Sequence, residues 1–298
     1  MPPQDPLVGR TIAGYHLSRL MGEGGTATVY RADHPQKGAV AFKVLRQRLA
    51  QDAVAVKRFL REAELGKRLE HPYIVKTFDF GQEDGLYYLA LEWVDGEPLA
   101  DFASRSGQLA PPLVATIIEQ VGAALSATHA RNIIHRDLKP ANIMFDPAKQ
   151  EAKLLDFGIA RDAETSSDER LTRAGFFVGT LQYVAPETLS GALVDEQADV
   201  YSLATIAYFL LTGTHPFPGK NPRELFQQLL TQNPVPLNQA EKGLKFSPAI
   251  ETAVMRGLER DLAKRTKTVD EFSQEFCTAV RENDGQKGGG FLKRLFGK

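Results

Sequence analysis

The sequence predicts an α+β fold of two lobes, in which a small β-rich lobe precedes a larger, mostly helical lobe. The first lobe is indicated by several short strand patterns before residue 95, together with one amphipathic helical pattern. The stretch Asp95-Gly96-Glu97-Pro98 breaks the last of these strand patterns. Helical patterns then follow from Pro111 to about residue 282. We therefore expect a first lobe at 14–94, a connecting segment at 92–97 and a second lobe at 97–283.

Composition and charge are those of an ordinary folded protein. The chain has 298 residues, 43% of them apolar and 24% charged, which suits one or two domains. A net charge of −1 gives no basic field that would predict nucleic-acid binding. The only cysteine, Cys277, cannot form an internal disulfide, so we expect a packing role and a reducing compartment. Neither a span of ~20 apolar residues nor the apolar core of a signal peptide is present, and we expect a cytoplasmic location.

The first lobe is expected to follow a flexible, Pro-rich leader at residues 1–13. Strand patterns at 15–21 and 27–32 flank the turn Gly22-Glu23-Gly24-Gly25, and a third strand pattern covers 40–45. Glycines allow a ligand to approach the backbone closely and present N–H groups to phosphate oxygens. Taken alone, however, a glycine-rich hairpin is more often structural than ligand-binding.

Lys43 lies among the apolar residues of the 40–45 strand. It could be an edge-strand lysine that reaches water, or it could neutralise an acid from another element. The helical pattern at 53–69 places Glu62 on the same face as Phe59 and Leu65. An acid on an inward face needs a cation, so we predict an ion pair between Lys43 and Glu62.

The second lobe follows a strand at 86–94 and begins with a long helix that opens at Pro111-Pro112. His129, near the end of that helix, is predicted to be a hydrogen-bonded core residue rather than a catalytic one. Further patterns predict a strand pair at 143–145 and 153–155, and helices at 199–211, 222–231, 248–259 and 268–282. The loop 213–220 resembles a P-loop, but its spacing and its two prolines are wrong for one. We interpret it as a connection between helices.

The run HRDLKPAN at 135–142 has more fixed polarity than a packing core tolerates, because a buried charge without a partner costs several kcal/mol. The sequences Asp156-Phe157-Gly158 and Ala185-Pro186-Glu187 follow it. The intervening residues 159–178 form a long polar stretch, and a loop of that length in a compact domain is usually functional or mobile. We interpret 135–142 as a catalytic loop.

In their order and spacing, these motifs resemble the eukaryotic-like (Hanks-type) serine/threonine protein kinases, and most of all the bacterial members of that family. The resemblance covers about residue 15 to about residue 280. It implies a two-lobed protein kinase fold that binds ATP and Mg²⁺, for which Mn²⁺ could substitute, and that phosphorylates protein substrates. The residues that the family pattern assigns to the nucleotide are Gly22, Glu23, Gly24, Gly25, Val29, Ala41, Lys43, Leu91, Glu92, Val94 and Met144.

The resemblance also implies the catalytic roles. Asp137 would accept the proton of the substrate hydroxyl, Lys139 would neutralise the transferring phosphoryl group, and Lys43 would hold the α- and β-phosphates while paired with Glu62. The metal ligands would be Asn142 and Asp156. The lysine two positions after the catalytic aspartate is typical of kinases that act on Ser and Thr.

The same resemblance implies how the activity would be regulated. Arg136 would receive a phosphate from the activation segment, with Thr172 as the modified residue and Thr165, Ser166 and Ser167 as weaker candidates. Thr180 would bridge Asp137 and Lys139, and Glu187 would pair with Arg265. The alternative is that these Ser and Thr residues belong to an ordinary soluble loop.

The sequence departs from the family pattern at the third glycine of the loop, where Ala27 stands and Gly25 is additional. In the family that the chain resembles, a small residue at this position is compatible with activity. A pseudokinase scaffold is the alternative function, although such proteins usually lack the equivalent of Lys43, Asp137 or Asp156 and this chain has all three. A small-molecule kinase is disfavoured by the Ala-Pro-Glu motif, which builds a docking shelf for a peptide.

The C-terminal residues 284–298 read as a glycine-rich linker followed by a short basic, amphipathic tail with a side-chain charge of +3, from four basic residues and one acidic residue. The tail at 291–298 could contact a membrane surface or a partner protein. A solvated, disordered end is the favoured interpretation, because so short a helix is marginal in water.

Overall fold

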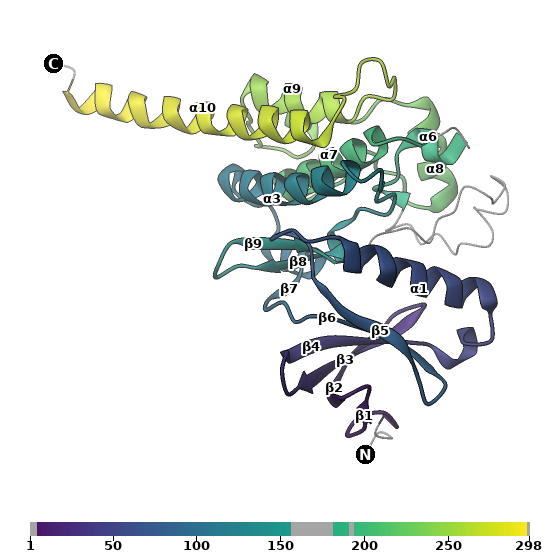
Figure 1. The fold of residues 1–298 in the computed structure, drawn as a ribbon. Helices are drawn as coiled ribbons and strands as arrows, with labels where there is room; N and C mark the ends of the chain where they lie inside the picture. Colours follow the sequence, from purple (N-terminus) through teal and green to yellow (C-terminus); the bar gives the residue numbers. More distant parts are fainter. Residues whose placement is uncertain (1–4, 156–180, 191–193, 297–298) are drawn as a thin grey trace. The chain divides into compact units, whose positions relative to one another are not determined.

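The structure is a computed structural model that describes residues 5–155, 181–190 and 194–296. The described chain forms two compact units, and the chain passes from the first to the second between Asp95 and Gly96. We call them the N-terminal unit, to which Leu155 also belongs, and the C-terminal unit. Each is described by itself. The protein kinase fold predicted from the sequence, with a β-rich first part and a helical second part, is confirmed (Figure 1).

The N-terminal unit is built on a curled antiparallel sheet of six strands in the order β1-β2-β3-β4-β6-β5. The strands predicted around residues 15–21, 27–32, 40–45 and 86–94 are all present. The strand β5 was not predicted, because its glycine and its polar residues break the alternation of apolar positions. The strand bounds are β1 Thr11–Ile12, β2 Tyr15–Glu23, β3 Ala27–His34, β4 Gly38–Leu45, β5 Thr77–Glu83 and β6 Leu86–Glu92.

The prediction of a flexible leader at 1–13 is wrong for the described residues 5–13. Asp5 accepts hydrogen bonds from the Tyr30 hydroxyl at 3.0 Å, and β1 pairs Ile12 with Tyr15. The Ile12 side chain is fully buried in the sheet's core. The polar composition of residues 5–13 predicted a loose leader. However, Asp5 and Ile12 of this stretch have partners in the sheet.

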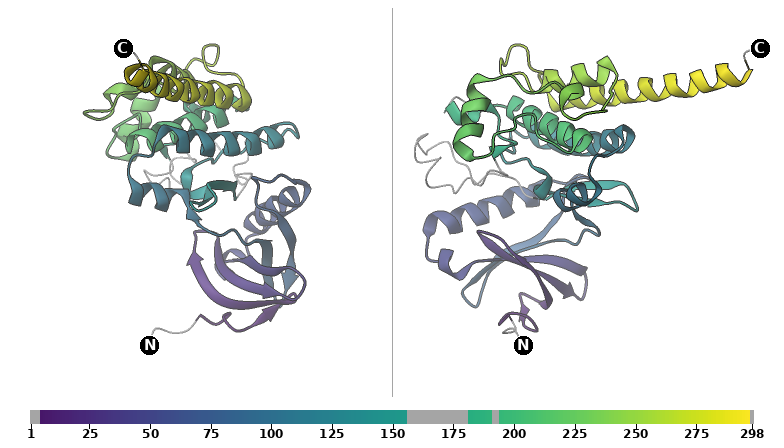
Figure 2. Two further views of the ribbon diagram at one scale, coloured as in Figure 1. Left: turned by 90° about the vertical axis from the view of Figure 1, so that its left-hand side faces the viewer. Right: turned by 180° about the vertical axis from the view of Figure 1, so that it is seen from behind.

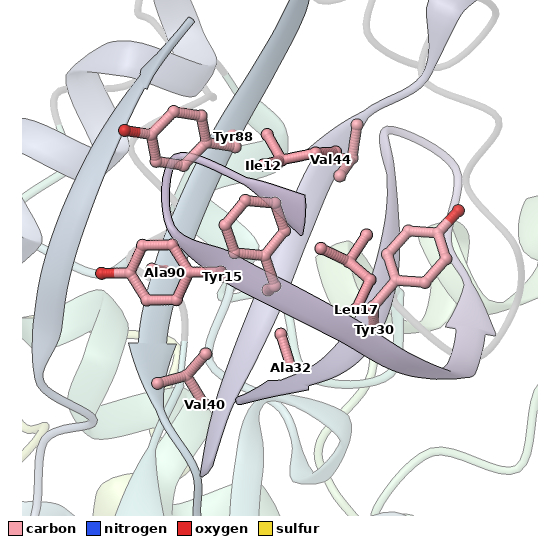
Figure 3. Close-up of a cluster of buried hydrophobic side chains, with 10 residues drawn as sticks. Ile12, Tyr15, Leu17, Tyr30, Ala32, Val40, Val44, Tyr88 and Ala90 are labelled. Carbon is pink, nitrogen blue, oxygen red and sulfur yellow. The ribbon is translucent and has the colours of Figure 1, made fainter. Parts of the chain in front are cut away.

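Two apolar clusters stabilise this unit. One lies inside the curled sheet and is formed by Ile12, Tyr15, Leu17, Tyr30, Ala32, Val40, Phe42, Val44, Tyr88 and Ala90 (Figure 3). In the other, Phe59 and Ala63 of helix α1 (Ala53–Arg68) pack on Leu89 and Leu91 of β6. The Asp52 side chain caps α1 by accepting from the backbone N–H groups of residues 54 and 55. The helix begins where the sequence predicted and ends one residue earlier.

The C-terminal unit has the helices α2 (Leu99–Ser106), α3 (Pro111–His129), α6 (Pro186–Ser190), α7 (Gln197–Thr212), α8 (Pro222–Thr231), α9 (Pro248–Gly257) and α10 (Val269–Phe296). A small sheet of β7 (Glu97–Pro98), β8 (Ile143–Asp146) and β9 (Glu151–Leu154) accompanies them. Nearly all of α7 is buried, and α3, α9 and α10 all contact it. The helix predicted at 199–211 is thus the centre of this unit.

Close packing explains the glycines at two positions in this unit. Gly96 has a φ of +107°, and a Cβ there would lie 2.2 Å from the carbonyl oxygen of Phe145. A Cβ on Gly257 of α9 would lie 2.5 Å from Ala204 of α7. Both positions therefore require glycine for the two chain segments to approach each other.

Helix α10 is longer than the sequence predicts. The pattern indicated an end near residue 282 and a glycine-rich linker beyond it, whereas one helix continues to Phe296 (Figure 2). It packs on α3 and α9. Each glycine costs about 1 kcal/mol relative to alanine, but extension of an existing helix avoids the cost of nucleation. Within the described ranges, no helix combines the length and apolar character required to cross a membrane.

Candidate active site

The glycine-rich turn joins β2 to β3 in the N-terminal unit. Gly22 is the register partner of Val29, and the N–H of Gly24 donates to the carbonyl of Ala27 at 2.8 Å. A Cβ on Gly22 or Gly25 would meet no atom within 4 Å, and neither residue has a positive φ. The fold itself therefore does not demand glycine at these two positions. The open space above the backbone fits a ligand that must approach it closely, such as a phosphate group.

Two arginines after β4 contact this turn. The Arg46 guanidinium pairs with the Glu23 carboxylate, and Arg48 donates to the carbonyl of Gly25 at 2.9 Å. The backbone N–H of Arg46 also donates to the carbonyl of Thr26 at 2.9 Å. These bonds determine the position of the turn in the isolated chain.

Lys43 lies at the middle of the sheet, since β4 stands between β3 and β6. This position excludes the alternative that Lys43 is an edge-strand residue. Its Nζ lies 3.8 Å from Oε1 of Glu62, and the two side chains are only 16% and 23% exposed. The predicted ion pair is confirmed. Restricted solvent access makes it less screened than a surface pair.

Several of the residues that the family pattern assigns to the nucleotide come from adjacent strands. Ala41 of β4 is the register partner of Leu91 of β6, and Val29 is the partner of Lys43. Leu91 is buried, and Val94 packs against the same cluster as α1. The neighbouring Trp93 lies under the Arg31 guanidinium, 5.0 Å from the ring centroid. The predicted nucleotide residue Met144 belongs to the other unit, where it pairs with Lys153 on β9.

The catalytic loop lies in the C-terminal unit and ends in the 3-10 turn η2 (Pro140–Asn142). Oδ2 of Asp137 lies 2.9 Å from Nζ of Lys139. The Asn142 amide donates to the Asp137 carbonyl at 2.8 Å and to its Oδ2 at 3.3 Å. The structure thus brings these three predicted residues together. Because Nδ2 of Asn142 makes these bonds, its Oδ1 is the atom available for a hard cation.

A buried acid that we did not single out from the sequence holds the start of this loop. Asp199 of α7 accepts hydrogen bonds from the backbone N–H groups of His135, at 2.8 Å, and Arg136, at 3.0 Å. Its Oδ2 also lies 2.8 Å from Nε2 of His129. Burial alone would raise the pKa of Asp199, but the side-chain hydrogen bond from His129, the charges of His135 and His129 and the backbone N–H of His135 outweigh it and keep the pKa below its usual value.

The signal for Asp199 was present in the sequence. It is a carboxylate in an otherwise apolar helical pattern, and such a group requires partners when that helix is buried. The backbone of Arg136 has a φ of +63°, a conformation that non-glycine residues rarely adopt and that surrounding contacts must stabilise. Asp199 supplies such a contact.

The prediction that His129 is a hydrogen-bonded core residue is confirmed, and His135 is buried as well. His129 is buried and bonded to Asp199, and His135 is fully buried with its Nδ1 3.3 Å from the N–H of Asp137. Cys277 is also buried, with a pKa that burial raises to about 11, which agrees with a packing role.

The Glu187 carboxylate on α6 makes a bidentate ion pair with Arg265, at 2.6 and 2.9 Å. The Arg265 side chain is fully buried. It also donates to the carbonyls of Gln197 and Glu259 and lies over the ring of Tyr201. The predicted pair is confirmed, and its geometry explains how a guanidinium is accommodated in the core.

Several predicted residues lie outside the described residues, namely Asp156, Thr165, Ser166, Ser167, Thr172 and Thr180. Of the two predicted metal ligands, the described chain therefore contains only Asn142. In that part of the chain, no three His, Cys, Asp or Glu side chains gather to hold a metal ion. An amide oxygen and an aspartate would supply the oxygen donors that Mg²⁺ prefers.

Comparison with known proteins agrees with this geometry. Residues 15–277 match the family model described as "Protein kinase domain". The chain is 39% identical to the serine/threonine-protein kinase pkn3 of Myxococcus xanthus, over 94% of this chain and 53% of that protein. It is 35% identical to PknH of Mycobacterium tuberculosis, over 98% of this chain and 46% of that protein. The chain thus spans about half the length of these curated relatives.

Solved structures show the same fold. The kinase domain of Mycobacterium tuberculosis PknI is 30% identical, with a TM-score of 0.70, and the match covers 91% of this chain and 98% of that one. Rad53, solved in complex with AMP-PNP, is 26% identical, with a TM-score of 0.71, over 89% of this chain and 65% of that one. With a matching family model over most of its length, the chain belongs to the protein kinase family, and the curated relatives named above are bacterial serine/threonine-protein kinases.

Proposed function

We propose that the protein transfers the γ-phosphoryl group of ATP to Ser and Thr hydroxyls of protein substrates, in a reaction that requires Mg²⁺. The observation that carries this proposal is the cluster of Asp137, Lys139 and Asn142 on a loop held by the buried Asp199. Phosphoryl transfer needs positioned charges more than covalent chemistry. A polar cluster on a rigid, buried support meets that need.

In this proposal, Asp137 orients the substrate hydroxyl and accepts its proton. Lys139 lies at hydrogen-bonding distance from Asp137 and provides positive charge beside the site of transfer. Asn142 and Asp156 would hold Mg²⁺, which neutralises charge on the phosphates when bound. Binding of ATP is supported by the open space at Gly22 and Gly25 and by the complex of the related Rad53 with AMP-PNP.

Lys43 would bind the α- and β-phosphates, and Glu62 would hold its ammonium group in place. A lysine in the middle of a sheet needs such a partner, because burial of an unpaired charge is costly. The backbone at residues 92–94 would hydrogen-bond the adenine edge, with Ala41 and Leu91 against the base.

A catalytically silent scaffold that binds ATP is the second candidate. It is favoured only by the change at Ala27 in the glycine-rich turn, whereas the ion pair of Lys43 and the Asp137 cluster are intact. The two functions differ in one measurable property, namely the appearance of phosphate on Ser or Thr.

The test is incubation of a bacterial lysate with ATP and Mg²⁺ and with either the wild-type protein or Asp137→Asn, followed by phosphosite mapping. We expect transfer to Ser and Thr by the wild type, and a loss of at least about a hundredfold in the variant, since general-base catalysis contributes about that much. Asp101→Asn, at an exposed position of α2, is the matched control. Equal phosphorylation by wild type and Asp137→Asn would refute the proposal that the protein is an active kinase.

We further propose autophosphorylation at Thr172, with Arg136 as the residue that binds the phosphate. A phosphothreonine carries about −1.5 to −2 charge at neutral pH and forms strong bonds with a guanidinium. The same mapping experiment tests it on the kinase itself. An active enzyme with no phosphate on Thr172, Thr165, Ser166 or Ser167 would contradict the proposal.

A further inference from the structure

The loop between α7 and α8, residues 213–220, resembled a P-loop in the sequence and has no role in the proposed chemistry. It starts at Gly213, whose φ of +73° ends α7 with a left-handed cap. The Thr212 hydroxyl donates to the carbonyl of Thr214 at 3.1 Å, and the Pro216 carbonyl accepts from Val235. The loop is thus well held on both sides of the residue between them, His215.

His215 contacts the segment that precedes the Ala185-Pro186-Glu187 motif. Its Nε2 lies 3.0 Å from the hydroxyl of Tyr183, and the two rings meet edge to face with centroids 5.3 Å apart. Phe209 of α7 stacks on the imidazole, with centroids 4.7 Å apart and an interplanar angle of 19°. Phe209 of α7 therefore orients the imidazole on one side. On the other side, the oriented ring bonds the Tyr183 hydroxyl.

Tyr183 is the middle of a short segment, residues 181–185, and two hydrogen bonds hold it. Its carbonyl accepts from the Ser202 hydroxyl at 2.8 Å, and its own hydroxyl bonds to His215. Just beyond the segment, Glu187 is fixed by Arg265. Of these contacts, only the one from His215 acts on a side chain of the segment itself.

The bond has a defined charge state. Burial lowers the pKa of His215 to about 4 and raises the pKa of Tyr183 above its ordinary value, so both groups are neutral at physiological pH. A neutral imidazole has one donor and one acceptor nitrogen, so it can bond a tyrosine hydroxyl without burying a charge. Loss of either partner leaves a polar group in a mostly apolar site.

We propose that His215 is a positioning residue for the peptide substrate, because it fixes Tyr183 and with it the segment 181–185. This segment ends at Ala185, the first residue of the motif that the family resemblance assigns to peptide docking. The inference rests on the proposed function, since it concerns how the same enzyme holds its protein substrate.

The test is kinetic and uses the full chain with a peptide substrate taken from the lysate phosphosites. We expect His215→Leu and Tyr183→Phe each to raise KM for the peptide about fivefold, the effect of one ordinary net hydrogen bond, with KM for ATP unchanged. The double variant should be no worse than either single variant, because both remove the same bond. His215→Gln, which can return a side-chain amide to the hydroxyl, should restore part of the loss.

A merely structural role would give a different result. It would lower the fraction of active enzyme, and so kcat, without separating the two KM values. Lys220→Ala, an exposed position of the same loop, is the matched control and should leave both KM values unchanged. Additive effects of His215→Leu and Tyr183→Phe, or wild-type KM for the peptide in both, would overturn the inference.

Hydrogen exchange provides a readout that does not depend on phosphoryl transfer. In His215→Leu, the amides of residues 182–185 should exchange faster, while those of α9 should keep wild-type protection. A wild-type protein that transfers no phosphate would refute the proposed function. Unchanged exchange at 182–185 would refute the anchoring by His215, whatever the activity of the enzyme.

Discussion

Replacement of Asp199 by asparagine tests whether the buried carboxylate holds the catalytic loop. In Asp199, Oδ2 receives bonds from the His135 N–H and the His129 ring, and Oδ1 receives the Arg136 N–H. An asparagine can retain one of these oxygen atoms. Its NH₂ group must then face a donor, so at least one buried N–H loses its acceptor.

The expected cost follows from these bonds. An unsatisfied buried donor costs about 1–3 kcal/mol, and the two remaining bonds lose the strengthening that a charged acceptor gives them. Asparagine avoids the desolvation of a buried charge, which offsets part of this loss. We expect a net loss of about 3 kcal/mol, which lowers the melting temperature by roughly 6–12 °C for a unit of this size.

Activity should fall more than stability explains. The two backbone N–H groups that Asp199 binds lie immediately before Asp137, and a small displacement of a catalytic group can reduce the rate about a hundredfold. The assay is calorimetric melting together with kcat at a temperature where the variant is fully folded, with Asp101→Asn as the control. A variant with wild-type kcat and a lowered melting temperature would show that Asp199 only stabilises the unit.

The difference in unfolding free energy between wild type and Asp199→Asn should depend on pH, because the pKa of Asp199 is lowered in the folded protein. A depressed pKa contributes stability that is present above the ordinary aspartate value of 3.8 and is lost as the pH falls through the folded value. The difference in unfolding free energy between wild type and Asp199→Asn should therefore shrink in strong acid, as the pH falls below about 3.8. A difference that vanished already at pH 6 would contradict this assignment.

Two further substitutions test the ion pairs. Lys43→Met should weaken ATP binding about 10–100-fold, because a hydrogen bond to a charged group contributes about 1.5–3 kcal/mol. The single tryptophan of the chain, Trp93, directly precedes Val94 in the expected adenine-binding segment, so its fluorescence can report the titration. Lys57→Met, at an exposed position of α1, is the control. Equal ATP affinities of the wild type and Lys43→Met would refute the assignment of Lys43 to the phosphates. Arg265→Met should cost about 3–5 kcal/mol of unfolding free energy, because it leaves Glu187 without its cation. Glu187→Gln/Arg265→Met should recover part of that loss, and a double variant as unstable as the sum of both single variants would contradict a direct pair.

Much of the fold followed from periodicity in the sequence. The helices at 53–69, 199–211 and 222–231 were found within two residues, because their apolar positions recur at helical spacing and clear capping residues flank two of them. The ion pair of Lys43 and Glu62 was predictable because an inward acid has few ways to be neutralised. The strand β5 and the N-terminal residues 5–13 were missed, since their stability comes from partners elsewhere in the sheet and local composition does not record those partners.

The catalytic loop shows where such reasoning stops. The residues of HRDLKPAN are adjacent in the sequence, so their polarity alone marked them. Their geometry depends on Asp199, more than 60 positions later in the chain, and we infer that the segment 181–185 depends on His215 in the same way. Both supports are side chains whose partners become evident only when α7 is seen to be buried. A polar residue within or directly after a buried helix is therefore the place to search for the residues that position an active site, because burial obliges it to bond a specific group.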